Sequence, residues 1–200
     1  MSHDSIEPSD LQPSELLNVI AGFFDSHDIA YRVVGSMASI AYGENRFTND
    51  IDIVADLKLS DVDALCEFFV PPDYFIARHA VEDAIRRRFQ FNIIHITCGL
   101  KIDVMLPKNN EYAALQQARA RRLSDPNGLS AWFAAPEDII LNKLIFFQKG
   151  GIEKHLRDIA GIIKVKKNDL DFDYIQHWSE KLNVTSEWSL VTKRIAESQP

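Results

Sequence analysis

Two aspartates, Asp50 and Asp52, are separated by one residue in the segment Thr48-Asn-Asp50-Ile-Asp52-Ile. Their alternation with isoleucine predicts a strand, on which side chains two residues apart leave the same face. Two carboxylates on one face can share metal ions, because carboxylate oxygens are the ligands that Mg²⁺ prefers. An isolated Asp-x-Asp pair is more typical of a solvated strand edge.

A Gly-Ser pair upstream favours the chemical interpretation. Gly35-Ser36 follows a predicted strand, Tyr31–Val34, and precedes a predicted short helix, Met37–Tyr42. Glycine permits a sharp turn and a close approach to a ligand. The free N–H groups and the positive dipole end of a helix that begins at Ser36 suit a phosphate. The turn and the aspartate pair together predict a site for phosphoryl or nucleotidyl transfer.

A third aspartate lies in a later predicted strand. Asp103 alternates with Ile102, Val104 and Leu106, so it belongs to the face opposite the apolar set. Alone, Asp103 would be an ordinary exposed strand residue. If its strand lies beside that of Asp50 and Asp52, the three carboxylates form one cluster.

This set resembles the polymerase-β-like nucleotidyltransferase superfamily in its Gly35-Ser36 turn, its Asp50-x-Asp52 pair and its later Asp103. The wording Arg46-Phe-Thr48-Asn-Asp50-Ile-Asp52-Ile is similar to a narrower bacterial group. That group comprises the minimal nucleotidyltransferases and the abortive-infection toxin nucleotidyltransferases of toxin–antitoxin pairs.

A second match to this group lies downstream. Pro136-Glu137-Asp138 with Lys143 resembles its Pro-Glu-Asp helix, and Lys154-His155-Leu-Arg157-Asp158 resembles its following Lys-Asp-x-x-Asp helix. His155 departs from the pattern, because the group usually has an acidic residue there. Lys143 lies close to an apolar stripe, which alone favours a snorkelling side chain; the resemblance favours contact with a triphosphate.

We therefore expect a Mg²⁺-dependent (or Mn²⁺-dependent) nucleotidyltransferase that moves NMP from an NTP to a hydroxyl of RNA, a protein or a small molecule. The expected metal-binding and catalytic residues are Asp50, Asp52 and Asp103. The expected nucleotide-binding residues are Gly35, Ser36, Lys143, Arg46 and Thr48, of which the last two position the loop or a phosphate. Arg157 and Asp158 are expected to brace the site, although Asp158 also suits a helix surface.

Composition limits the partners. The 200 residues carry a net charge of −7, and binding of long nucleic acid depends mostly on neutralising phosphates. Local basic clusters could still hold a short RNA end. One such cluster, Arg86-Arg87-Arg88, is either a solvated group or a contact for a phosphate. Two cysteines and no long apolar run predict a cytoplasmic protein without a disulfide framework or membrane span.

The elements that position these residues predict an α/β (α+β) protein with a small mixed sheet flanked by helices and a helical C-terminal domain. We expect a nucleotidyltransferase domain over 1–108 and a mainly helical domain over 109–200, with the site between them. Helices are predicted near residues 13–27, 62–69, 80–88, 111–122, 136–149, 152–165, 172–182 and 186–196. Besides the two strands named above, strands are predicted over 89–96, 100–106 and 129–134.

Three functions remain open. The first is an active nucleotidyltransferase, which could be the toxin of a pair with an antitoxin protein. The second is an inert relative that binds a nucleotide or a partner protein without turnover. The third is a structural protein with a coincidental acidic cleft. Metal-dependent nucleotide binding separates the first two from the third, and analysis of products separates the first from the second.

Overall fold

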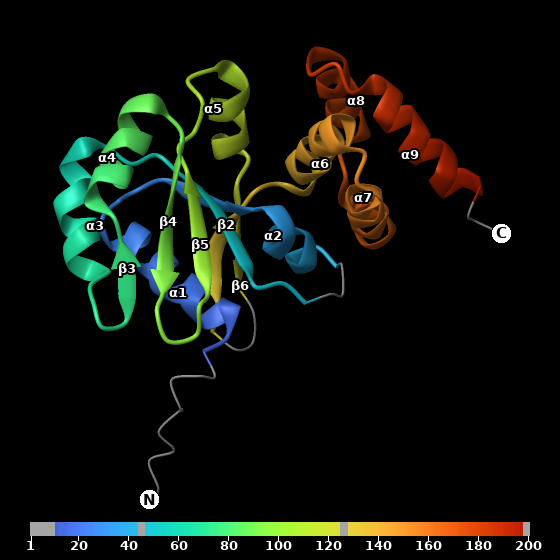
Figure 1. Cartoon of the computed structure of the whole chain (residues 1–200). Coiled ribbons are helices and arrows are strands. Elements are labelled where there is room, and N and C mark those ends of the chain that lie inside the picture. Colours follow the sequence, from blue (N-terminus) through green and yellow to red (C-terminus); the bar gives the residue numbers. More distant parts are fainter. Residues whose placement is uncertain (1–10, 44–46, 125–127, 198–200) are drawn as a thin grey trace, which may run out of the picture. The chain divides into compact units, whose positions relative to one another are not determined.

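The chain folds into two compact units (Figure 1). The computed structural model describes residues 11–43, 47–124 and 128–197. The first unit runs to Met37 and resumes from Phe47 to Phe133, and the second takes 38–46 and all residues from Ala134. The described residues between 109 and 133 include two strands of the first unit's sheet, Arg121–Ser124 and Ser130–Phe133. The predicted domain boundary at residue 108 stays a prediction.

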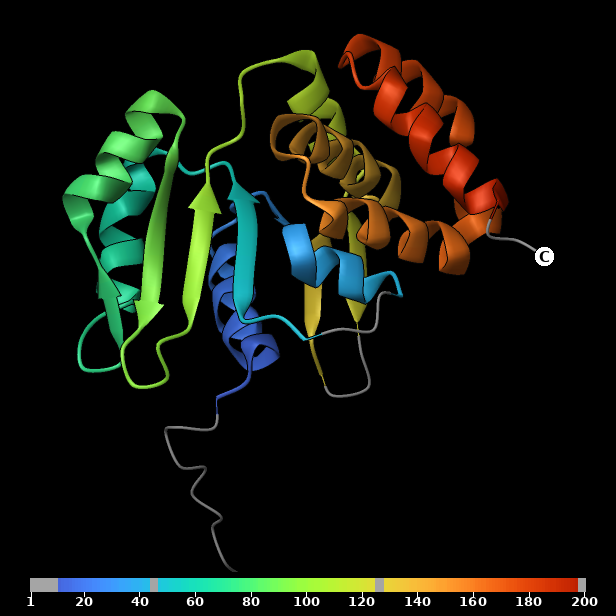
Figure 2. The ribbon, with the colours of Figure 1, turned by 45° about the vertical axis from the view of Figure 1, so that its right-hand side comes forward.

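The first unit is built on a mixed sheet. In the described residues its strand order is β3-β4-β5-β2-β1-β7-β6, with the β2–β5 and β1–β7 pairs parallel and the other pairs antiparallel. The strands are β1 (Tyr31–Val34), β2 (Asp50–Ala55), β3 (Tyr74–Ile76), β4 (Gln90–His95), β5 (Lys101–Met105), β6 (Arg121–Ser124) and β7 (Ser130–Phe133). Figure 2 shows β2 and β5 side by side in the middle of this sheet.

One face of the sheet is buried under helices. Strands β2, β4, β5 and β7 alternate buried and accessible residues, and the residues buried under the helices include Val33, Ile53, Ile93, Val104 and Phe133. The helices of this unit are α1 (Pro13–Ser26), η2 (Leu59–Asp61), α3 (Val62–Phe68), α4 (Arg78–Arg87) and α5 (Glu111–Ala118). Helix α1 contacts β2 and β7, and α4 contacts β4. Burial of one face leaves the alternate residues of β2 and β5 on the other face.

A short helix, α2 (Gly35–Ala41), follows β1 directly. It begins at Gly35, two residues before the predicted start, because Gly35 has a φ of 64° and turns the chain out of the strand. The predicted helix over 111–122 is wrong at its end, since α5 stops at Ala118 and Arg121 and Arg122 belong to β6. Strand β3 was not predicted.

Helix α5 is attached to the sheet by a buried arginine. Arg32, on β1, is 3% exposed and donates to Gln117 Oε1 at 2.8 Å and to Gln116 Oε1 at 3.2 Å. Gln117 Nε2 donates in turn to the carbonyl of Tyr31 at 3.3 Å. Hydrogen bonds of this kind compensate for burying the guanidinium, and they explain why α5 belongs to the sheet unit.

The second unit is helical. It contains the end of α2 with α6 (Pro136–Gly150), α7 (Glu153–Lys166), η3 (Lys167–Asp169), α8 (Phe172–Lys181) and α9 (Thr185–Glu197). Helix α6 contacts α7, α8 and α9. The predicted start of α6 at Pro136 is observed, as is its end at Gly151, which has a φ of 64°. None of the described helices has the length and apolar character of a membrane span.

The acidic first turn of α6 is buried. Glu137 and Asp138 are both 0% exposed. Glu137 Oε1 accepts from the backbone N–H of Asp171 at 3.2 Å, and Asp138 Oδ1 accepts from the hydroxyl of Tyr174 at 2.7 Å. These bonds connect α6 to the start of α8. The sheet unit and the helical unit together confirm the predicted fold class.

The change Tyr174→Phe should lower the free energy of unfolding by about 1–3 kcal/mol, because it removes a hydrogen bond to a buried carboxylate. Urea denaturation followed by circular dichroism measures this loss. Tyr74→Phe is the matched control, since the Tyr74 hydroxyl makes no hydrogen bond within the described residues. Equal stabilities of the two variants would contradict a bracing role for Tyr174.

Candidate functional site

The register of β2 against β5 brings the three aspartates together. Asp52 lies opposite Asp103, and Asp50 lies opposite Lys101. Residues directly opposite each other on neighbouring strands share a face, so all three carboxylates leave the sheet on the face opposite the buried residues Ile53 and Val104. Asp50 is exposed, while Asp52 and Asp103 are half-buried.

Gly35 lies against Asp52. A Cβ atom added to Gly35 would stand 2.1 Å from Asp52 Oδ2 and 2.9 Å from Asp52 Cγ. Strand β1 explains this proximity, because Val34 is the register partner of Asp52 and the chain turns at the next residue. The turn therefore meets the carboxylate cluster at Asp52, and only glycine leaves room for that approach.

A lysine lies inside the carboxylate cluster. Lys101 Nζ is 2.9 Å from Asp103 Oδ2. The hydrogen bond to Asp103 raises the pKa of Lys101, partial burial opposes the rise, and the charges of Asp103, Asp50 and Asp52 add to it. Asn92, the β4 neighbour of Asp103, donates to Asp103 Oδ1 at 2.7 Å with its amide turned to satisfy both groups. Both oxygens of Asp103 therefore have partners on the sheet.

The chemistry of this donor set fits a hard divalent cation. Three carboxylates on two neighbouring strands supply the oxygen ligands that Mg²⁺ and Mn²⁺ favour. In the described residues, however, no group of three or more His, Cys, Asp or Glu side chains is arranged to hold a metal ion. Strands β2 and β5 place three carboxylates side by side, as a metal site requires. The carboxylate of Asp103, however, forms an ion pair with Lys101.

The other expected nucleotide-binding residues of this unit lie near the cluster in sequence. Thr48 Oγ1 accepts from the backbone N–H of Asp50 at 3.3 Å, which braces the entry to β2. Ser36 is half-buried in the first turn of α2. Arg46, which we expected to position the loop or a phosphate, lies outside the described residues.

In the helical unit, Lys143 and Asp158 form a buried ion pair. Lys143 is 6% exposed and Asp158 is 1% exposed, and Lys143 Nζ bonds to Asp158 Oδ2. The helix-surface alternative for Asp158 is therefore wrong. The pair connects α6 to α7 and gives both residues a structural role. Contact of Lys143 with a triphosphate stays a prediction.

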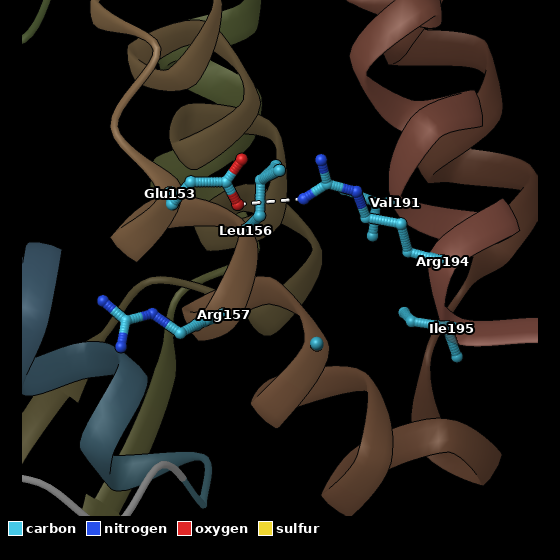
Figure 3. A pocket seen from close by; sticks show the side chains of 7 residues that line it. Glu153, Leu156, Arg157, Val191, Arg194 and Ile195 are labelled. Atoms are coloured by element: carbon cyan, nitrogen blue, oxygen red, sulfur yellow. Dashed lines mark hydrogen bonds and ion pairs between the residues drawn. The ribbon is translucent and has the colours of Figure 1, made fainter. Parts of the chain in front are cut away.

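Arg157 lines a pocket of about 190 Å³ in the helical unit (Figure 3). The pocket lies between α7 and α9 and is crossed by an ion pair from Arg194 to Glu153 at 2.9 Å. Figure 3 shows the Arg157 side chain extending away from that pair. The bracing role that we expected of Arg157 also stays a prediction.

Each arginine of the Arg86-Arg87-Arg88 cluster has an acidic partner. Arg86 pairs with Glu82 at 3.0 Å, Arg87 with Asp83 at 3.2 Å and Arg88 with Asp56 at 3.2 Å. All three side chains are largely exposed, so these pairs contribute little to stability. They match the interpretation of a solvated charge cluster.

Sequence reasoning missed Lys101. The signal was present, because Lys101 precedes Asp103 by two residues and strand alternation places both on one face. What the sequence did not show is the pairing partner of Lys101, since only the register of β2 against β5 places Asp50 opposite it.

The change Gly35→Ala should destabilise the first unit by about 1–3 kcal/mol more than Gly99→Ala, as measured by urea denaturation. Both glycines have a φ of 64°, so both variants carry the same backbone strain. A Cβ at Gly99 would meet nothing within 4 Å, whereas a Cβ at Gly35 meets Asp52 and forces a rearrangement. Equal losses of stability would show that Asp52 gives way without cost.

The change Lys143→Met should lower the free energy of unfolding by about 3–5 kcal/mol, because it leaves the buried carboxylate of Asp158 without its cation. The double change Lys143→Met with Asp158→Leu should recover most of this loss. Lys164→Met, at an exposed position on α7, controls for net charge. A Lys143→Met protein as stable as the wild type would contradict the structural role.

Comparisons with known proteins indicate the fold. No protein-family model matches the sequence, and no curated protein matches it. Among solved structures, the antigenic nucleotidyltransferase-like protein from Paracoccidioides brasiliensis is similar over 78% of this chain and 77% of its own, at 20% identity and a TM-score of 0.51.

Two structures of ANT(2'')-Ia are also similar. The complex with adenylyl-2''-tobramycin matches 88% of this chain and 98% of its own, at 12% identity and a TM-score of 0.57. The solution structure, described as an antibiotic-resistance factor, matches 92% and 97% at 11% identity and a TM-score of 0.52. These likenesses show that the chain shares its fold with solved nucleotidyltransferase and nucleotidyltransferase-like structures.

Proposed function

We propose that this protein is a nucleotidyltransferase that transfers NMP from an NTP to a hydroxyl group of an acceptor. The observation that carries the proposal is the row made by Asp52 and Asp103 on β2 and β5, with the Gly35 turn against Asp52. The fold supports the same reaction class. Three carboxylates beside a turn that closely approaches them suit the transfer of a charged phosphoryl group.

Asp50, Asp52 and Asp103 would hold Mg²⁺ or Mn²⁺. When bound, such an ion neutralises phosphate charge and polarises the oxygens around the α-phosphorus. The carboxylates of β2 are on a strand paired on both sides, which restricts their movement and fixes the direction in which they point. This rigidity suits a site that must align two reacting oxygens.

The remaining residues of the sheet unit would orient the substrates. The Gly35-Ser36 turn would contact phosphate oxygens through its backbone, at the point where it meets Asp52. Asp103 would orient the acceptor hydroxyl in line with the α-phosphate. Thr48 would hold the start of β2 through its bond to the Asp50 N–H, and Arg46 would contact a phosphate.

The helical residues contribute less directly to this proposal. Lys143 would reach the triphosphate only after leaving Asp158, and breaking that buried pair is costly. Arg157 is exposed on α7, so it would brace a bound substrate without the free-energy cost of breaking a buried ion pair. Substitution of Lys143 and substitution of Arg157 test these two proposed contacts separately.

A small molecule is the favoured acceptor class. The net charge of −7 and the pairing of Arg86, Arg87 and Arg88 with acids oppose binding of a long RNA. ANT(2'')-Ia, which shares the fold, has been solved with an adenylylated tobramycin. A protein or an RNA end as acceptor, in the setting of a toxin with an antitoxin protein, is the other form of the proposal.

A second candidate is an inert nucleotidyltransferase-like protein that binds a nucleotide or a partner protein. The ion pair between Lys101 and Asp103 favours it, because that pair keeps one of the three carboxylates from a metal ion. The two candidates differ in turnover. Incubation with each labelled NTP and a panel of RNA, protein and aminoglycoside acceptors separates them.

Binding of NTP with Mg²⁺ should raise the thermal midpoint of the wild-type protein. A ligand at 100 times its Kd adds about 2.7 kcal/mol, which is roughly 5–10 °C for a chain of this size. Asp52→Asn should abolish both the Mg²⁺-dependent shift and the transfer, because it removes a carboxylate from the centre of the row. Differential scanning fluorimetry with the four NTPs, with and without Mg²⁺, makes the measurement.

Asp83→Asn is the matched control for this experiment. Asp83 is exposed on α4, where it pairs with Arg87, so the variant loses the same charge away from the row. It should keep the wild-type shift and transfer. Transfer by Asp52→Asn at the wild-type rate, or absence of any shift in the wild type, would refute the proposed site.

A further inference from the structure

Lys101 is a cation in direct contact with the carboxylate row, and no proposed step uses it. It extends from β5 on the same face as Asp103, and its register partner on β2 is Asp50. Its Nζ atom bonds to Asp103 Oδ2 at 2.9 Å, and the charges of Asp50 and Asp52 act on it as well. A single ammonium group therefore interacts with the same three carboxylates that would bind a metal ion.

We propose that Lys101 is the internal counter-ion of the carboxylate row and that a divalent cation binds there by displacing it. This inference rests on the proposed function, because it concerns the same three carboxylates. Lys101 is thus a positioning residue whose side chain competes with the metal ion for Asp103. Its contact with Asp103 occupies one oxygen of a carboxylate that the row would offer to the ion.

The geometry of Asp103 supports competition. Its Oδ1 accepts from Asn92 and its Oδ2 accepts from Lys101, so each oxygen already has a hydrogen-bond partner on a sheet strand. Asn92 is neutral and can keep its bond while the carboxylate also binds a cation. Lys101 carries the same sign of charge as the ion, so the two repel each other when they share Asp103.

Displacement is sterically possible because the lysine side chain is 44% exposed. A four-carbon chain that reaches solvent can move its ammonium without disturbing the strand. The freed ammonium would remain at the edge of the row, where it could contact an anionic group of a bound substrate. Binding of the metal ion would then be coupled to the release of a cation for the nucleotide.

The experiment measures Mn²⁺ binding to the full chain by electron paramagnetic resonance and isothermal titration calorimetry, without nucleotide. Lys101→Met should bind Mn²⁺ about tenfold more tightly than the wild type, because the competing charge is removed. Lys108→Met, an equal change of net charge at an exposed position beyond β5, should bind within twofold of the wild type. Circular dichroism in metal-free buffer checks that each variant is folded.

A second measurement uses the wild-type protein alone, so it remains decisive if Lys101→Met does not fold. Acetylation of lysines, quantified by mass spectrometry, should increase at Lys101 when Mn²⁺ is added and stay constant at Lys108. An unchanged Lys101 signal at saturating Mn²⁺ overturns the inference.

The outcomes separate the inference from the proposed function. If the wild type and Lys101→Met bind Mn²⁺ with equal affinity, Lys101 does not compete and the inference fails while the metal site stands. If neither protein binds Mn²⁺ at millimolar concentration, the proposed metal site fails and the inference fails with it.

Discussion

The parallel pairing of β2 with β5 is the constraint on which the candidate site depends. Side chains on a strand alternate between faces, so a slip of one residue would move Asp103 into the core and Val104 out of it. The buried residues Ile51, Ile53, Ile102 and Val104 prevent that slip, because their burial stabilises one register only. The packing of the core thus determines which carboxylates meet on the opposite face of the sheet.

The turn at Gly35 converts this register into a defined local geometry. Strand β1 pairs with β2 on the side away from β5, and Val34 lies opposite Asp52. The chain then leaves the strand at a positive φ and packs its backbone against the Asp52 carboxylate. Asp52 is therefore enclosed by β5 on one side and by the turn on the other, while Asp50 remains exposed.

The sequence was sufficient for the features that depend on local pattern. Alternation predicted β2 and β5, and Gly35 and Pro136 marked the starts of α2 and α6 closely. The sequence was insufficient for features that depend on contacts between residues far apart in the chain or on side-chain conformation. The Lys101–Asp103 pair depends on side-chain conformation, and the burial of Lys143 with Asp158 depends on how α6 packs on α7. Helix α5 ends early because Arg121 and Arg122 pair with β7, a partner that no local pattern identifies.

The pairs made by Arg86, Arg87 and Arg88 have a consequence for encounter kinetics. Each positive charge lies within 3.2 Å of a negative one, so from a distance this surface presents dipoles instead of a positive field. Dipolar fields fall off faster with distance than the field of a net charge, and electrostatic steering requires the latter. These arginines therefore supply no net positive field that would accelerate the approach of an anionic polymer to this side of the sheet unit.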